Sequence, residues 1–67
     1  LDMHVAWDRT PVSVHGPKDE LQTILEHLRN NHQVHKHSLI MPDRESDGEA
    51  VFFIYQPCDP KWFMEMK

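Results

Sequence analysis

The stretch from Ala50 to Tyr55 is apolar on both faces of any strand that it forms. Successive side chains of a strand point to opposite faces of the sheet. One face carries Ala50, Phe52 and Ile54, and the other carries Val51, Phe53 and Tyr55. A strand with two apolar faces is typical of the middle of a sheet that is covered on both sides. The rest of the chain therefore has to supply neighbouring strands and two covering layers.

The chain is too short to supply much cover. It has 67 residues, enough for one small domain over residues 1–67, which is either complete or a fragment of a longer protein. Its single cysteine excludes an internal disulfide, the usual reinforcement of small secreted domains, and fits a reducing cytoplasmic location. No segment approaches the roughly 20 apolar residues that span a membrane, so we expect no membrane partner.

The charge balance argues against nucleic-acid binding. Asp and Glu number 11 and Lys and Arg number 7, for a formal net charge of -4. Proteins that bind DNA or RNA neutralise phosphates with clustered Lys and Arg, and this chain has no basic cluster. We expect no direct nucleic-acid partner.

The remaining pattern predicts two short strands at residues 3–7 and 12–15, as a hairpin or as one kinked strand. A helix is predicted over 17–31 by the apolar spacing of Leu21, Ile24, Leu25 and Leu28, with a left-handed stop at Asn30-Asn31. An edge strand over 33–41 and a short helix from Pro60 to Lys67 complete the elements.

These elements predict an α+β fold: a small antiparallel or mixed sheet with one main helix, in the order (β)βαββ(α). A right-handed crossover through the helix leaves a gap between two parallel strands, and the strand at 50–55 fills it. This split arrangement resembles the first half of a ferredoxin-like sandwich, a likeness of fold alone.

The main helix covers one face of this sheet, and only eight residues (60–67) remain for the other. A two-turn helix is too short to cover a sheet. We therefore expect a second copy or another protein to cover it, with the C-terminal segment either folding back or anchoring in the partner. The predicted partner-binding residues are Trp7, Val51, Phe53, Tyr55, Trp62, Phe63 and Met66.

A histidine cluster suggests a second kind of site. His32, His35 and His37 lie at the junction of helix and strand, with His27 one turn upstream. Histidines two apart on a strand point the same way, so these three can offer imidazole ligands to zinc, nickel or copper. Exposed polar histidines at a helix end explain the same pattern without a metal.

Two further features predict no chemistry. Cys58 precedes a possible helix start, but the neighbouring Asp59 opposes thiolate formation. The acidic loop 43–49 fails as a calcium loop, because Ile54 stands at the twelfth position, where the bidentate Glu is needed. Nothing in the sequence combines a nucleophile, a base and a pocket, so we expect no enzyme.

The sequence thus favours a small acidic, non-enzymatic interaction module. We expect it to regulate or inhibit a larger protein, and a homodimer fits the same pattern. Two alternatives remain: a histidine-based divalent-metal-binding domain, and a small-molecule sensor built from paired half-ferredoxin units.

Overall fold

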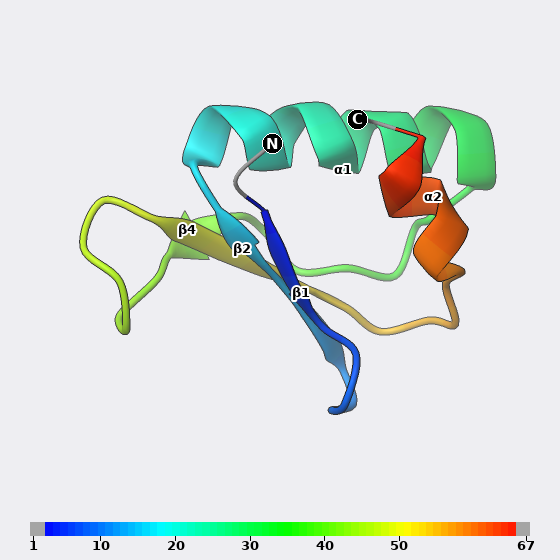
Figure 1. Cartoon of the computed structure of the whole chain (residues 1–67). Coiled ribbons are helices and arrows are strands. Elements are labelled where there is room, and N and C mark those ends of the chain that lie inside the picture. Colours follow the sequence, from blue (N-terminus) through cyan, green and yellow to red (C-terminus); the bar gives the residue numbers. More distant parts are fainter. Residues whose placement is uncertain (1–2, 66–67) are drawn as a thin grey trace.

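The doubly apolar segment forms the inner strand β4 (Ala50–Ile54) of a four-stranded sheet (Figure 1). The computed structural model describes residues 3–65. The strand order is β1 (His4–Ala6), β2 (Val12–Gly16), β4, β3 (Met41–Pro42), and neighbouring strands are antiparallel throughout. The predicted middle position is confirmed for residues 50–54, and Tyr55 follows the strand.

The main helix α1 (Lys18–His32) connects β2 to the segment that leads into β3. Because β2 and β3 each run antiparallel to β4, they are parallel to each other, and β4 fills the gap between them. The predicted α+β fold is confirmed. The ferredoxin-like half remains a prediction. Residues 4–16 form a hairpin, which settles the alternative that the sequence left open.

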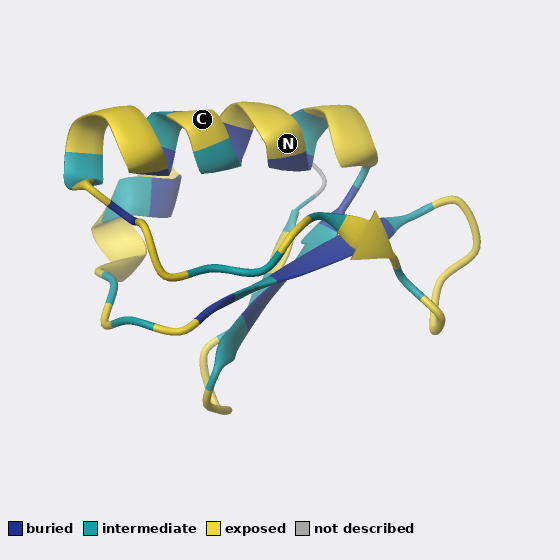
Figure 2. Cartoon of the chain, turned by 180° about the vertical axis from the view of Figure 1, so that it is seen from behind, coloured by how far each residue is buried: buried dark blue, intermediate teal, exposed yellow. Residues whose placement is uncertain are grey.

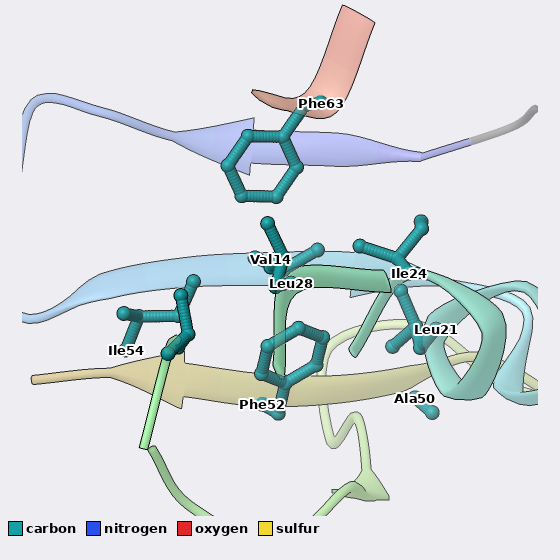
Figure 3. Packing of buried hydrophobic residues seen from close by; sticks show 9 residues of the cluster. Val14, Leu21, Ile24, Leu28, Ala50, Phe52, Ile54 and Phe63 are labelled. Atoms are coloured by element: carbon teal, nitrogen blue, oxygen red, sulfur yellow. The ribbon is translucent and has the colours of Figure 1, made fainter. Parts of the chain in front are cut away.

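The core lies between α1 and one face of the sheet (Figure 3). Val14 of β2 and Phe52 of β4 are opposite each other and fully buried. Leu21, Ile24 and Leu28 project from α1 onto them, which is the spacing that predicted the helix. Side chains of this kind each contribute about 1.5–3 kcal/mol when fully buried.

The helix ends later than predicted. Asn30 and Asn31 are still helical, and the left-handed residue is Gln33, with φ 55° and ψ 40°. The backbone N–H of Val34 donates to the carbonyl of Leu28, and Val34 is fully buried. Burial of Val34 thus favours an end at Gln33 over the intrinsic left-handed preference of asparagine.

The predicted strand over 33–41 is wrong in its extent. Only Met41–Pro42 forms a regular strand, preceded by an isolated bridge between His37 and Ile54. The ladder is interrupted because the Ser38 hydroxyl, in place of a backbone carbonyl, accepts the N–H of Phe53 at 2.9 Å. The segment therefore follows β4 as an irregular edge.

The short helix α2 (Pro60–Met64) begins where predicted, with Asp59 as its cap: the Asp59 carboxylate accepts the Lys61 N–H at 2.9 Å. It packs on the same side of the sheet as α1 (Figure 1). Phe63 joins the core and meets the Trp7 ring edge-on, with centroids 5.2 Å apart. Trp7 thus lies on the helix side of the sheet, whereas the sequence placed it with Val51 and Phe53.

Figure 2 shows that the outer side of α1 is exposed and that its buried residues face the sheet. Both helices lie over one face of the sheet, so among residues 3–65 no helix covers the opposite face. Within the same residues, no helix is long and apolar enough to cross a membrane.

Candidate functional site

The sheet face that points away from α1 is called the far face here. Residues directly opposite each other in antiparallel strands share a face. Met41, Val51, His15 and His4 therefore form one row across all four strands, and Phe53, Ser13 and Ala6 form the next. The far face thus combines apolar side chains from β3 and β4 with polar side chains from β1 and β2.

A hollow of about 360 Å³ lies on the far face. Val51 and Phe53 of β4 and Met41 of β3 form its apolar part. Arg9, from the turn between β1 and β2, and Arg44, from the loop after β3, also line it. An adjoining hollow of about 360 Å³ extends toward β1.

A chain of three hydrogen-bonded side chains crosses the far face. The His15 ring contacts Ser13 Oγ through Nε2 at 2.9 Å and Asp43 Oδ2 through Nδ1 at 2.8 Å. A neutral His15 in this arrangement donates a hydrogen bond from Nδ1 to the carboxylate and accepts one from the Ser13 hydroxyl at Nε2. Because β4 lies between β2 and β3, the contact from His15 to Asp43 passes over β4 beside Val51. This explains why Val51 is only 7% exposed without a helix above it.

The order of these contacts is that of serine hydrolases, in which a histidine joins a serine to a carboxylate. Ser13, however, is only 1% exposed and lies in a strand that is paired on both sides. An attacking hydroxyl needs access to the substrate and nearby free amides to stabilise the oxyanion. The arrangement instead attaches the loop 43–49 to the sheet.

The loop contact predicts a specific pH dependence. The hydrogen bond from His15 is the largest cause that holds the pKa of Asp43 below its ordinary value of 3.8, and the Glu45 amide adds to it. A lowered folded-state pKa stabilises the attached loop fully above pH 3.8, and this stabilisation disappears as the pH falls through the folded pKa. We expect the Glu45 amide proton, which bonds Asp43 Oδ1 at 3.0 Å, to report this transition in NMR spectra.

The Asp43→Asn variant should lose that acidic transition, because an amide does not titrate. Asp47→Asn, in the exposed part of the same loop, is the control and should retain it. An unchanged transition in Asp43→Asn would show that another group holds the loop.

The predicted partner-binding residues fall into separate groups. Val51 and Phe53 lie on the far face, and Tyr55 follows them with 57% of its surface exposed. Phe63 is in the core with 4% exposed, so burial removes it from the accessible surface. Trp62 is half-buried beside α1. Met66 lies outside the described residues.

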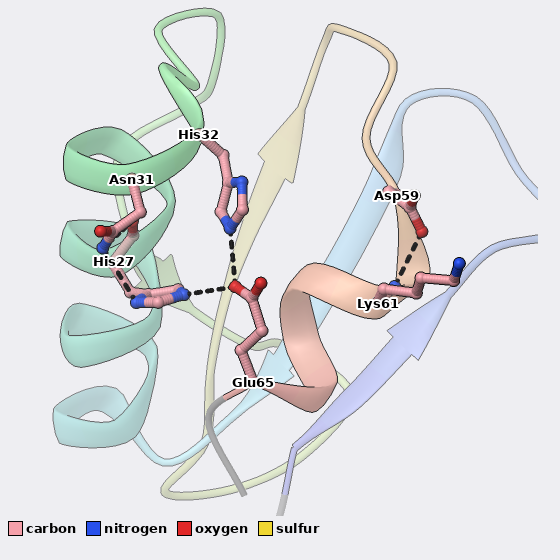
Figure 4. A network of polar contacts seen from close by, with 6 residues as sticks. All are labelled: His27, Asn31, His32, Asp59, Lys61 and Glu65. Atoms are coloured by element: carbon pink, nitrogen blue, oxygen red, sulfur yellow. Dashed lines mark hydrogen bonds and ion pairs between the residues drawn. The ribbon is translucent and has the colours of Figure 1, made fainter.

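The histidines predicted as metal ligands are also separated. The His37 ring donates from Nδ1 to the Ser38 carbonyl at 2.8 Å, and the exposed His35 contributes its backbone N–H to Gln56 Oε1 at 2.9 Å. His32 instead joins His27 and Glu65 (Figure 4). Among residues 3–65, this is the one group of three side chains with donor atoms close enough to hold a metal ion together.

The cluster of His27, His32 and Glu65 joins the end of α1 to the end of α2. Nε2 of His27 lies 2.8 Å and Nε2 of His32 lies 2.6 Å from Glu65 Oε1. These two hydrogen bonds lower the pKa of the Glu65 carboxyl, and the bond from His27 has the larger effect. The His32 ring stacks on Trp62, with centroids 4.4 Å apart and planes 12° from parallel.

Cys58 is not activated as a nucleophile. Partial burial raises the pKa of its thiol, and the charge of Asp59 raises it further. Both effects favour the protonated, unreactive form.

Comparison of the chain with protein-family models, with curated proteins and with solved structures found no match.

Proposed function

We propose that the chain is a non-enzymatic interaction module that pairs with a second copy of itself through the far face. The observation that carries the proposal is that both helices pack on one side of the sheet. Phe53 and Met41 on the other side are covered by no helix within residues 3–65. Apolar surface of this kind is stabilised when a partner removes it from water.

The charges around the hollow favour a second copy. Arg9 and Arg44 form no ion pair with any of the described residues 3–65, and neither does Glu45, which lines both hollows beside Arg9. Across a two-fold axis every contact occurs twice: where one residue meets a second residue of the partner copy, the second residue also meets the first. Each arginine of one copy can then meet Glu45 of the other.

The dimensions also suit a pair. A standard interface buries about 800 Å² on each partner. The chain exposes 4742 Å² in total, so an interface of this size takes about a sixth of its surface. A domain of fewer than about 70–80 residues seldom gains more than about 3–5 kcal/mol from its own core, and association is a common source of further stability.

Reversal of complementary charges tests this pairing. Arg9→Glu and Glu45→Arg each place like charges opposite each other in the two-fold pair, so we expect each variant alone to sediment as a monomer. In their equimolar mixture both two-fold-related contacts again join opposite charges, so we expect it to form a mixed dimer. Lys18→Glu, on the exposed start of α1, is the control and should leave the wild-type mass unchanged.

The outcomes distinguish the possible occupants of the far face. If the wild type forms dimers but the mixture of the two variants does not associate, the result contradicts this docking geometry. A wild-type chain that stays monomeric would overturn the proposal and leave a larger protein as the occupant, as the regulator or inhibitor prediction requires. A dimer that forms only with a small molecule in the hollow would support the sensor alternative instead.

A further inference from the structure

The histidine cluster between α1 and α2 is a second candidate site, and its role does not depend on self-association through the far face. His27 and His32 lie in the last turns of α1, and Glu65 is the C-cap residue that directly follows α2 (Figure 4). From this geometry we infer that His27, His32 and Glu65 form a binding site for a divalent transition metal of the zinc class.

The donor set suits such an ion. Two imidazole nitrogens and one carboxylate oxygen bind zinc in proteins, with a water or another ligand in the fourth position. The three donor atoms lie within 4.8 Å of one another. Tetrahedral zinc with bonds of about 2.0–2.1 Å holds its ligand atoms roughly 3.3 Å apart, a separation inside this limit.

The Glu65 side chain has to move to admit the ion. Glu65 Oε1 is closer to both nitrogens than a shared ion allows, at 2.8 Å and 2.6 Å. The Glu65 side chain is 45% exposed and can turn outward, whereas the two histidines are held by their surroundings. The ion takes the place of the two N–H protons that point at the carboxylate, and each neutral ring then carries its proton on Nδ1.

Neighbouring residues hold both rings in place. Asn31 contacts Nδ1 of His27 at 3.1 Å, and the Trp62 ring stacks on His32. When Nε2 of His27 binds a metal, its Nδ1 carries the proton, and Asn31 has to present its amide oxygen in place of its Nδ2. Asn31 then gives up the hydrogen bond that Nδ2 donates to the His27 carbonyl at 3.1 Å. Partners of this kind orient metal-binding histidines.

The consequence for the fold is a cross-link. Glu65 lies 38 residues beyond His27 and 33 beyond His32. A metal at this position ties the five-residue helix α2 to the end of α1. Metal ligation is one of the routes by which small domains without disulfides gain stability.

Isothermal titration of the untagged chain with Zn²⁺ tests the site directly. We expect a one-to-one complex in the micromolar range or tighter, and a rise of roughly 10–20 °C in Tm at a hundredfold excess over the dissociation constant. His27→Gln, His32→Gln and Glu65→Gln should each weaken binding by at least the roughly tenfold that changes around a metal site cause. Circular dichroism verifies that each variant is folded.

His35→Gln and His37→Gln are the matched controls, because they remove histidines that lie outside the cluster. We expect both variants to bind Zn²⁺ like the wild type. Loss of binding in these controls with retention in His27→Gln would overturn the assignment, and so would the absence of binding at millimolar Zn²⁺. A tetrahedral visible spectrum with Co²⁺ that disappears in Glu65→Gln would confirm the carboxylate as a ligand.

Discussion

Replacement of Phe52 by alanine is expected to leave the chain unfolded at 25 °C. Phe52 is fully buried in the inner strand, below Leu21 and Leu28 of α1 and opposite Val14 (Figure 3). Removal of a buried phenylalanine side chain costs about 3–5 kcal/mol. A domain of this size has a stability of about the same magnitude. Urea denaturation followed by circular dichroism measures the loss.

Phe53→Ala is the matched control, because it removes the same side chain from the next residue. Phe53 is half-buried and points to the far face, away from the core. We expect this variant to fold and to lose mainly its ability to associate. Equal destabilisation by the two substitutions would contradict the division of β4 into a core face and a far face.

Phe63→Ala should detach α2 from the rest of the molecule. The Phe63 ring packs against the core and against Trp7, and a five-residue helix is not stable in isolation. We expect a loss of about 3 kcal/mol in unfolding free energy, together with loss of the NMR contacts between Glu65 and the two histidines. The Met64→Ala variant, in which the replaced side chain is 65% exposed, should change neither.

The Phe63→Ala variant also decides between two roles for the C-terminal aromatic residues. If Phe63 served as an anchor for a partner, one of the two alternatives that the sequence left open, its replacement would leave the stability of the isolated chain unchanged. The structure instead places the ring in the core, so a stable Phe63→Ala variant would contradict the packing of α2.

The sequence predicted the elements with strong local patterns. The apolar spacing of Leu21, Ile24 and Leu28 determines the helix, and the two apolar faces of residues 50–54 determine the middle strand. Topology followed from these two, because a crossover helix leaves one gap that a central strand can fill.

Weaker patterns led to errors where tertiary contacts decide the outcome. Nothing in residues 33–41 indicates that the Ser38 hydroxyl replaces a backbone acceptor and interrupts the ladder. The side of the sheet that α2 occupies is equally hidden, since Trp62, Phe63 and Met66 fit either side. The edge-on contact between Phe63 and Trp7 is formed only by tertiary packing.

The contacts of His15 and the histidine cluster were likewise predictable only in part from the sequence. Ser13 and His15 are two residues apart on one strand, so the sequence alone predicts that they share a face. Asp43 reaches them only because β3 lies beside β4. The histidine cluster depends on Glu65, which no local spacing connects to α1, and so the sequence pointed to the neighbouring His35 and His37.

The mass of the untagged chain in solution, measured by light scattering over a range of concentrations at neutral pH, tests the central claim most directly. Self-association through the far face predicts that the mass rises to twice the 8.0 kDa of one chain. Phe53→Asp, which places a charge in the apolar hollow, should then keep the mass of a single chain. A wild-type mass of 8.0 kDa at every concentration would contradict the account.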